Sequence, residues 1–196
     1  MGYTKVRGYN DKELLNRIKS LPSFKFIPNN YWIIGIRSTE DTYNVFDDKF
    51  YIFKGEKFID VLTGTTNTGG YGLKEFKKWS SKGAAQIKDN EMYYDVWTRG
   101  KHRGKVAALK QTGPFKVIRD RNMNERSGDS SEWSWEEWKG LNFHPNTYNL
   151  AQTVKRWIVG KWSTGCQVVN DIPKYKKFME KTQPQKTFTY CLLKEF

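Results

Sequence analysis

The sequence predicts one domain that is mostly β or α+β, with few short helices. Three observations support this. The length of 196 residues suits a single domain, and no linker or internal repeat divides residues 1–196. Short apolar and aromatic runs bounded by turn residues dominate the chain after Tyr31. Aromatic residues make up 16% of the chain, which is typical of the core of a small β-rich fold.

Two segments have the apolar spacing of helices. The first is expected at about 10–20, where Asn10 can cap the helix and Glu13, three residues later, completes a capping box. The second is expected at 172–181, where Pro173 suits the first helical turn. Both segments carry apolar residues on one face, so each helix is expected to pack against the sheet.

The remaining regular segments read as strands. Lys54-Gly55-Glu56 lies between two of them and predicts a hairpin turn. The expected strands are 31–36, 49–53, 57–62, 92–98, 105–111, 115–119, 140–144, 166–169 and 187–193. The glycine-rich segment 64–70 is not followed by Gly-Lys-Ser/Thr, so we expect a loop between strands and not a phosphate-binding loop.

The formal net charge is +13, and residues 99–126 carry much of the excess. A basic surface indicates polyanionic partners such as nucleic acid, acidic lipid headgroups or an anionic cell-wall polymer. The alternative is a protein that simply has many surface lysines. No run of about 18 apolar residues occurs, so no membrane span is expected. The first residues lack the apolar stretch of a secretory signal, so synthesis in the cytosol is expected.

The chain has two histidines, His102 and His144, and two cysteines, Cys166 and Cys191. None of them shows the ligand spacing of a zinc site, so we expect no metal and no other cofactor. Cys191 lies within the apolar run 187–193 and is expected to pack as a small core residue.

Cys166 has a different setting, because the small residues Ser163, Thr164 and Gly165 precede it. Such a turn lets the backbone approach a ligand closely, and its N–H groups can face a developing oxyanion. A nucleophilic thiol also needs a base, and His144 ends the expected strand 140–144. From the residues alone, a structural role for Cys166 stays the alternative.

The segment from His144 to Asn170 resembles the catalytic motif of the YkuD-type L,D-transpeptidases. That motif is a His, a spacer, Ser/Thr-His-Gly-Cys, an apolar strand and Asn. Ser163, Gly165, Cys166 and Asn170 match it, and His144 stands at the position of the base. The resemblance implies a β-sandwich-type domain, Cys166 as nucleophile, His144 as base, and an oxyanion hole formed by the backbone around Gly165. It places Ser163 in the same catalytic motif, within 142–171.

The sequence departs from the family pattern at Thr164, which stands where the family has His. A wider likeness over 31–37, 101–111 and 161–169 is to a divergent group of such proteins from bacteriophages and Bacteroidetes-type bacteria. We expect further residues to contact substrate beside the cysteine. These are Thr164, Trp162, His102, Gln111 and Arg119.

Two of these assignments have an alternative. His102 lies between two glycines and also fits an exposed hairpin, and Trp162 also fits the core. The acidic, tryptophan-rich segment 130–138 is expected to form a helix, which is either a lid over the site or packed on the sheet.

The resemblance implies a cysteine enzyme that acts on the stem peptides of peptidoglycan. Without a secretory signal, a phage-type role in lysis or in the virion is favoured, with cleavage of the peptide or cross-link preferred over its formation, at the bacterial cell wall. The alternative from another class is a non-catalytic basic module that binds cell-wall polymer or nucleic acid. A cysteine–histidine hydrolase of another family is a third hypothesis.

Overall fold

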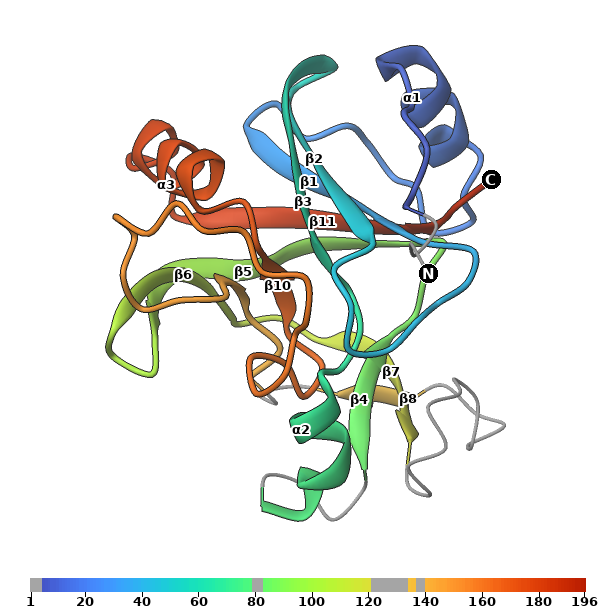
Figure 1. Ribbon diagram of the computed structural model, residues 1–196. Coiled ribbons are helices and arrows are strands. Elements are labelled where there is room, and N and C mark those ends of the chain that lie inside the picture. Colours follow the sequence, from blue (N-terminus) through green and yellow to red (C-terminus); the bar gives the residue numbers. More distant parts are fainter. Residues whose placement is uncertain (1–4, 79–82, 121–133, 137–139) are drawn as a thin grey trace.

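The computed structural model describes residues 5–78, 83–120, 134–136 and 140–196, and it is mostly β, as the sequence predicts (Figure 1). The main sheet has eight strands: β1 (Tyr31–Arg37), β2 (Asp48–Lys54), β3 (Lys57–Thr65), β5 (Glu91–His102), β6 (Val106–Gln111), β9 (Phe143–Pro145), β10 (Gln167–Val169) and β11 (Thr187–Lys194). A second, small sheet contains β4 (Ala84–Ile87), β7 (Phe115–Asp120) and β8 (Ser134–Glu136). The helices are α1 (Asp11–Lys19), α2 (Gly70–Lys74), the 3-10 turn η1 (Phe76–Lys78) and α3 (Ile172–Lys181).

The main sheet closes on itself in the order β1-β11-β5-β6-β9-β10-β3-β2, with β2 paired again to β1. Two neighbouring pairs are parallel, β1 with β11 and β9 with β10, and the other pairs are antiparallel. In Figure 1, α1 and α3 lie toward one end of this sheet, and α2 and the small sheet lie toward the other. Strand β9 contains His144, and Cys166 directly precedes β10, so this pair brings together two residues singled out in the sequence.

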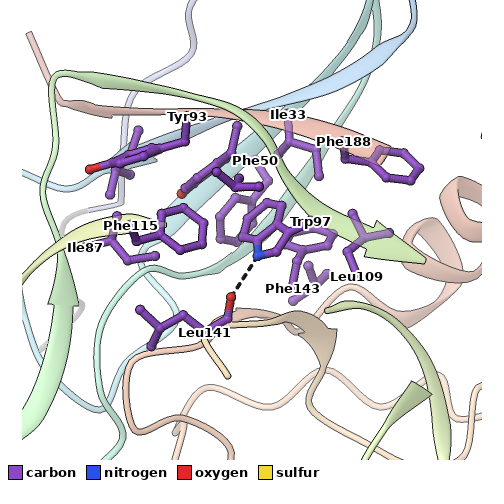
Figure 2. Close-up of a cluster of buried hydrophobic side chains, with 14 of the residues drawn as sticks. Ile33, Phe50, Ile87, Tyr93, Trp97, Leu109, Phe115, Leu141, Phe143 and Phe188 are labelled. Carbon is purple, nitrogen blue, oxygen red and sulfur yellow. Dashed lines mark hydrogen bonds between the residues drawn. The ribbon is translucent and has the colours of Figure 1, made fainter. Parts of the chain in front are cut away.

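The interior of the closed sheet is filled by aromatic side chains. Trp97, Phe115, Phe143 and Tyr190 are fully buried and pack edge to face or tilted, with ring centroids 4.6–6.3 Å apart. Figure 2 shows the first three of them in this cluster. The indole Nε1 of Trp97 donates a 2.7 Å hydrogen bond to the carbonyl of Leu141. Burial of each such ring stabilises the fold by roughly 2–3 kcal/mol. The bond to Leu141 fixes the segment that leads into β9.

Both long helices form where the sequence predicts them. In α1, Asn10 Oδ1 accepts from the N–H of Glu13 and Glu13 Oε2 accepts from the N–H of Asn10, both at 2.9 Å, so the capping box is confirmed. In α3, Asp171 caps the helix at Lys174 N, and Pro173 occupies the first turn. Cys191 is fully buried in the cluster between α1 and the sheet, which confirms it as a core residue.

Three segments differ from the expectation. The glycine-rich segment 64–70 is not all loop, because β3 continues to Thr65 and α2 begins at Gly70. Strand β4 was not predicted. Residues 134–136 form strand β8, since their backbone pairs with the edge of β7, so the expected helix over 130–138 is wrong there. The rest of that segment lies outside the described residues.

Over the part of the chain that the structure describes, no helix is both long enough and apolar enough to span a membrane.

Candidate functional site

The parallel pair β9–β10 brings His144 and Cys166 onto one face of the sheet. Val168 is in register with His144, and the N–H of Gln167 donates to Asn142 O at 2.9 Å, so Cys166 lies beside Asn142. Side chains alternate along a strand, and Phe143 points into the core. Asn142, His144, Cys166 and Val168 therefore share the opposite face. The thiol hydrogen bond in this structure runs to Gly140 O, at 3.3 Å.

The turn before Cys166 is held by its own side chains. Ser163 Oγ accepts from the N–H of Gly165 at 3.1 Å and donates to the carbonyl of Cys166 at 2.9 Å. Gly165 has a φ of +122°, and a Cβ there would come within 2.8 Å of Ala85 O and of Leu141 Cδ2. Only glycine fits this turn without displacing the two neighbouring segments. Ser163 thus shapes the turn, and its role in a catalytic motif stays a prediction.

Gln167 supports the cysteine from inside the sheet. Its Oε1 accepts from the hydroxyl of Tyr190 at 2.7 Å, and its Nε2 donates to Gly165 O at 3.3 Å. The side chain is fully buried. Gln167 therefore links the turn to the core, a role that the sequence pattern did not reveal.

His144 is fully buried, and its contacts assign its proton. Nδ1 lies 2.9 Å from the carbonyl oxygen of Pro145, which can only accept, so Nδ1 carries the hydrogen. Nε2 then has a free lone pair, and it makes no hydrogen bond with any described residue. Burial, helped by the neighbouring His102, lowers the pKa of His144 to about 3. The imidazole is therefore neutral at physiological pH, with an unprotonated Nε2 whose basicity burial has lowered.

His102 stacks on His144, with ring centroids 3.8 Å apart and planes inclined by 20°. Asn142 Oδ1 accepts from the N–H of Gln111 at 3.0 Å, so its Nδ2 faces His102 Nδ1, at 3.3 Å, as a donor. His102 therefore carries its hydrogen on Nε2. Burial lowers the pKa of His102 to about 4. The pair thus consists of two neutral rings with opposite tautomers, one with a bare Nε2 and one with an Nε2–H.

The thiol of Cys166 is partly exposed. Burial of most of its surroundings raises its pKa to about 11, although the backbone N–H of Asn142 and the charge of Arg103 oppose this shift. At neutral pH the resting state is therefore a thiol beside a neutral imidazole, and not a thiolate–imidazolium pair. Any attack by Cys166 needs removal of its proton during the reaction.

Trp162 lies close to Cys166, since both pack against the small cluster of Phe46, Val159 and Val168. Its ring meets that of Tyr148 edge to face, with centroids 5.0 Å apart. Lys105 Nζ lies 5.1 Å from the Tyr148 ring. This position fits both the predicted wall and the alternative core role of Trp162, so substrate contact stays a prediction. Tyr148 was missed, although an exposed aromatic four residues after His144 is a usable signal.

Asn146 is a second residue that sequence reasoning missed. Its N–H donates to Val169 O at 2.9 Å, which continues the ladder of β9 and puts its side chain on the face of His144. The side chain is fully buried, yet neither Oδ1 nor Nδ2 has a hydrogen-bond partner among the described residues. A buried amide left unsatisfied costs about 1–3 kcal/mol. Asn146 therefore places an unsatisfied amide on the same face of β9 as His144.

The other predicted residues have contacts within the protein. Gln111 Oε1 accepts from Leu141 N at 2.9 Å, and its Nε2 donates to Gly113 O. Arg119 lies on β7 and donates to Gly83 O at 2.9 Å. Thr164 O accepts from Ala85 N at 3.4 Å. These contacts hold the segments around the cysteine turn, and substrate contact by the three residues stays a prediction.

Asn170, which the family pattern singled out, also joins two segments. Its Nδ2 donates to Arg156 O at 2.7 Å, and its Oδ1 accepts from Thr63 Oγ1 at 2.6 Å. It thereby ties the loop between β9 and β10 to strand β3.

Within the described ranges, no group of three or more His, Cys, Asp or Glu side chains has the geometry to hold a metal ion. Comparison of the chain with protein-family models, with curated proteins and with solved structures found no match.

Proposed function

We propose that this protein is a cysteine-dependent acyl-transfer enzyme of the YkuD L,D-transpeptidase type that acts on peptidoglycan stem peptides. The observation that carries the proposal is the face of β9–β10, where Cys166 lies diagonally beside a buried histidine whose Nε2 is bare and unpartnered. A general base needs such an unprotonated nitrogen, and the two residues are diagonal neighbours on one face of the sheet.

In the proposed first step, His144 Nε2 takes the proton of Cys166 as Sγ attacks an amide carbonyl of the stem peptide. The tetrahedral intermediate collapses to a thioester, and the imidazolium returns the proton to the leaving amine. Water then attacks the thioester while His144 accepts its proton, and the acid product and the free thiol are released. An amine in place of water gives transpeptidation by the same path.

The oxyanion needs N–H donors near the thiol. The N–H of Gly165 already donates to Ser163 Oγ, so we assign the role to the N–H of Cys166, which makes no hydrogen bond among the described residues. The backbone N–H of Asn142, which faces the sulfur and opposes the rise of its pKa, is the second donor. His102, with its hydrogen on Nε2, offers a further donor to the substrate.

The finer assignments rest on the resemblance at Ser163, Gly165, Cys166 and Asn170. They include a YkuD-like β-sandwich-type domain, a preference for cleavage over cross-linking, and action at the bacterial cell wall in phage lysis or in the virion. The closed main sheet with a small second sheet supplies the mostly-β scaffold that this proposal requires.

The rival proposal is a non-catalytic basic binding module. It is favoured by the raised pKa of Cys166, which leaves the resting thiol unactivated, and by the net charge of +13. The third hypothesis is a cysteine–histidine hydrolase of another family. Such an enzyme would show no preference for peptidoglycan stem peptides over unrelated peptides, so substrate preference separates it from the main proposal.

Purified muropeptides, incubated with the protein and analysed by mass spectrometry, test these alternatives. The proposal expects loss of a terminal residue or of a cross-link with the wild type and with Cys191→Ala, but not with Cys166→Ala. Turnover that survives Cys166→Ala, or no turnover across several peptidoglycan chemistries, would refute it. Equal cleavage of unrelated peptides would assign the enzyme to another family.

A further inference from the structure

A groove lies away from the cysteine turn, at the end of the sheet where Figure 1 shows α3 and the β2–β3 hairpin. It consists of three adjoining cavities that share Tyr31. The central cavity has a volume of about 490 Å³. Its walls are formed by Asn30, Tyr31, Lys54, Lys181, Thr182, Pro184, Gln185, Lys186 and Thr187.

The lining of the central cavity contains three lysines and no carboxylate. Lys177 lines the adjoining cavity, where the single carboxylate, Asp60, is ion-paired with Lys174 at 2.8 Å. The groove lysines are Lys54, Lys177, Lys181 and Lys186, and none of them makes an ion pair among the described residues. Nearby lysines outside the groove do find partners, as Lys19 does with Glu56 at 2.7 Å.

A fifth cation lies behind the groove wall. Arg99 Nη2 donates to Met179 O at 2.9 Å and to Thr182 Oγ1 at 2.7 Å. Its Nε is buried and has no hydrogen-bond partner in the described residues, and no carboxylate pairs with the guanidinium. Among the described residues that line the three cavities, four lysines face two carboxylates, Asp60 and Asp95, and the central cavity has lysines alone as its charged residues. A cavity lined in this way favours an anionic ligand.

The arrangement of the lysines favours an extended ligand over a single small anion. Lys177 and Lys181 are one helical turn apart on α3, so they project from the same side of the helix. Lys54 and Lys186 continue the charge along the groove from the hairpin and from the segment before β11. Lysines bind phosphate as point charges, so a row of them suits a chain of repeating phosphates.

The central cavity offers little to nucleobases, although Phe178 and Phe26 each line one of the adjoining cavities. Tyr31 is the one aromatic residue in the lining of the central cavity, and Lys54 Nζ lies 5.5 Å from its ring centroid. Single-stranded nucleic acids are bound by several aromatic rings on which successive bases stack. We propose that the central cavity of this groove binds a phosphodiester chain without bases, such as a polyol-phosphate polymer. This second site is independent of the chemistry proposed for Cys166.

The test compares two ligands with equal numbers of phosphates, a synthetic glycerol-phosphate oligomer and an oligothymidylate. Their binding to the Cys166→Ala protein is measured by calorimetry across a range of salt concentrations. The groove variant is Lys54→Gln with Lys181→Gln. The matched control is Lys12→Gln with Lys74→Gln, which removes the same charge from exposed sites on α1 and α2. All four lysines are exposed, so both variants are expected to fold.

We expect the glycerol-phosphate oligomer to bind the groove variant at least about tenfold more weakly at low salt, with a shallower dependence on salt, whereas the control stays within about twofold of the parent. Equal weakening by both variants would overturn the groove as the site. Tighter binding of oligothymidylate would overturn the base-free ligand, and no binding of either ligand would overturn the proposal as a whole.

Discussion

The adjacent carboxylates Asp47 and Asp48 predict a pH-dependent stability that a single substitution removes. Both side chains are buried, at 2% and 1% exposure. Asp48 accepts hydrogen bonds from the N–H of Ser38 and from the N–H and hydroxyl of Thr66, at 2.6–2.8 Å, and these favour its ionised form. Asp47 accepts one bond, from Ser38 Oγ at 2.7 Å, and its Oδ1 has no partner among the described residues.

Burial, together with the charge of Asp48, raises the pKa of Asp47 to about 7. The folded state therefore binds a proton that the unfolded state releases near pH 4. Stability falls as the pH rises from about 4 to about 7, and the full loss persists above pH 7. About three pKa units correspond to roughly 4 kcal/mol, which is an upper bound because Asp48 titrates with Asp47.

Asp47→Asn keeps an oxygen for Ser38 Oγ and removes the charge. We expect it to stabilise the protein by about 2–4 kcal/mol at pH 8 and by less than about 1 kcal/mol at pH 4. Urea unfolding of both proteins between pH 4 and pH 8 measures this, with Glu56→Gln on the exposed hairpin as the control. A difference between wild type and Asp47→Asn that does not change with pH would refute the reasoning.

Three further predictions concern the cysteine turn and the first helix. Because the pKa of Cys166 is raised to about 11, its alkylation by iodoacetamide should be slow at pH 7. The alkylation rate, followed by mass spectrometry, should rise about tenfold per pH unit up to pH 10. A rate that reaches a plateau below pH 8 would contradict the raised pKa. Gly165→Ala should destabilise the fold by roughly 2–4 kcal/mol in chemical unfolding. A φ of +122° is strained for alanine, and the nearby Ala85 leaves no space for a Cβ. An unchanged unfolding midpoint would contradict this prediction. Asn10→Ala should cost about 1 kcal/mol through loss of the bond to Glu13 N, whereas an effect below about 0.3 kcal/mol would show that the cap is not needed.

The features that the sequence predicts well depend on neighbouring residues. The Asn10–Glu13 capping box and the hairpin at Gly55 are set by residues three or four apart, and both appear in the structure. The closure of the sheet could not be predicted in this way. It depends on β11 entering between β1 and β5, which pairs Cys191 with Ile34 and with Met92, both far away in the sequence. Local propensity contains no information about such pairings.

The candidate site also has features that the sequence predicted and features that it could not predict. The resemblance in the sequence singled out Cys166 and His144, and the turn chemistry of Ser163 and Gly165 was readable from their small size. The stacking of His102 on His144 and the unpartnered amide of Asn146 depend on the register of β9 against its neighbours. No spacing in the sequence specifies that register, because a shift of one residue would turn His144 to the other face.

The proposed pairing of Cys166 with His144 is tested most directly by looking for the acyl-enzyme. The intact protein is mixed with muropeptides, quenched with acid, and its mass is measured. The account predicts a mass increase equal to the acyl fragment, located on Cys166, in the wild type and in Cys191→Ala. The increase should be strongly reduced in His144→Gln and absent in Cys166→Ala. Turnover without any adduct on Cys166, or an adduct that forms equally fast in His144→Gln, would contradict the account.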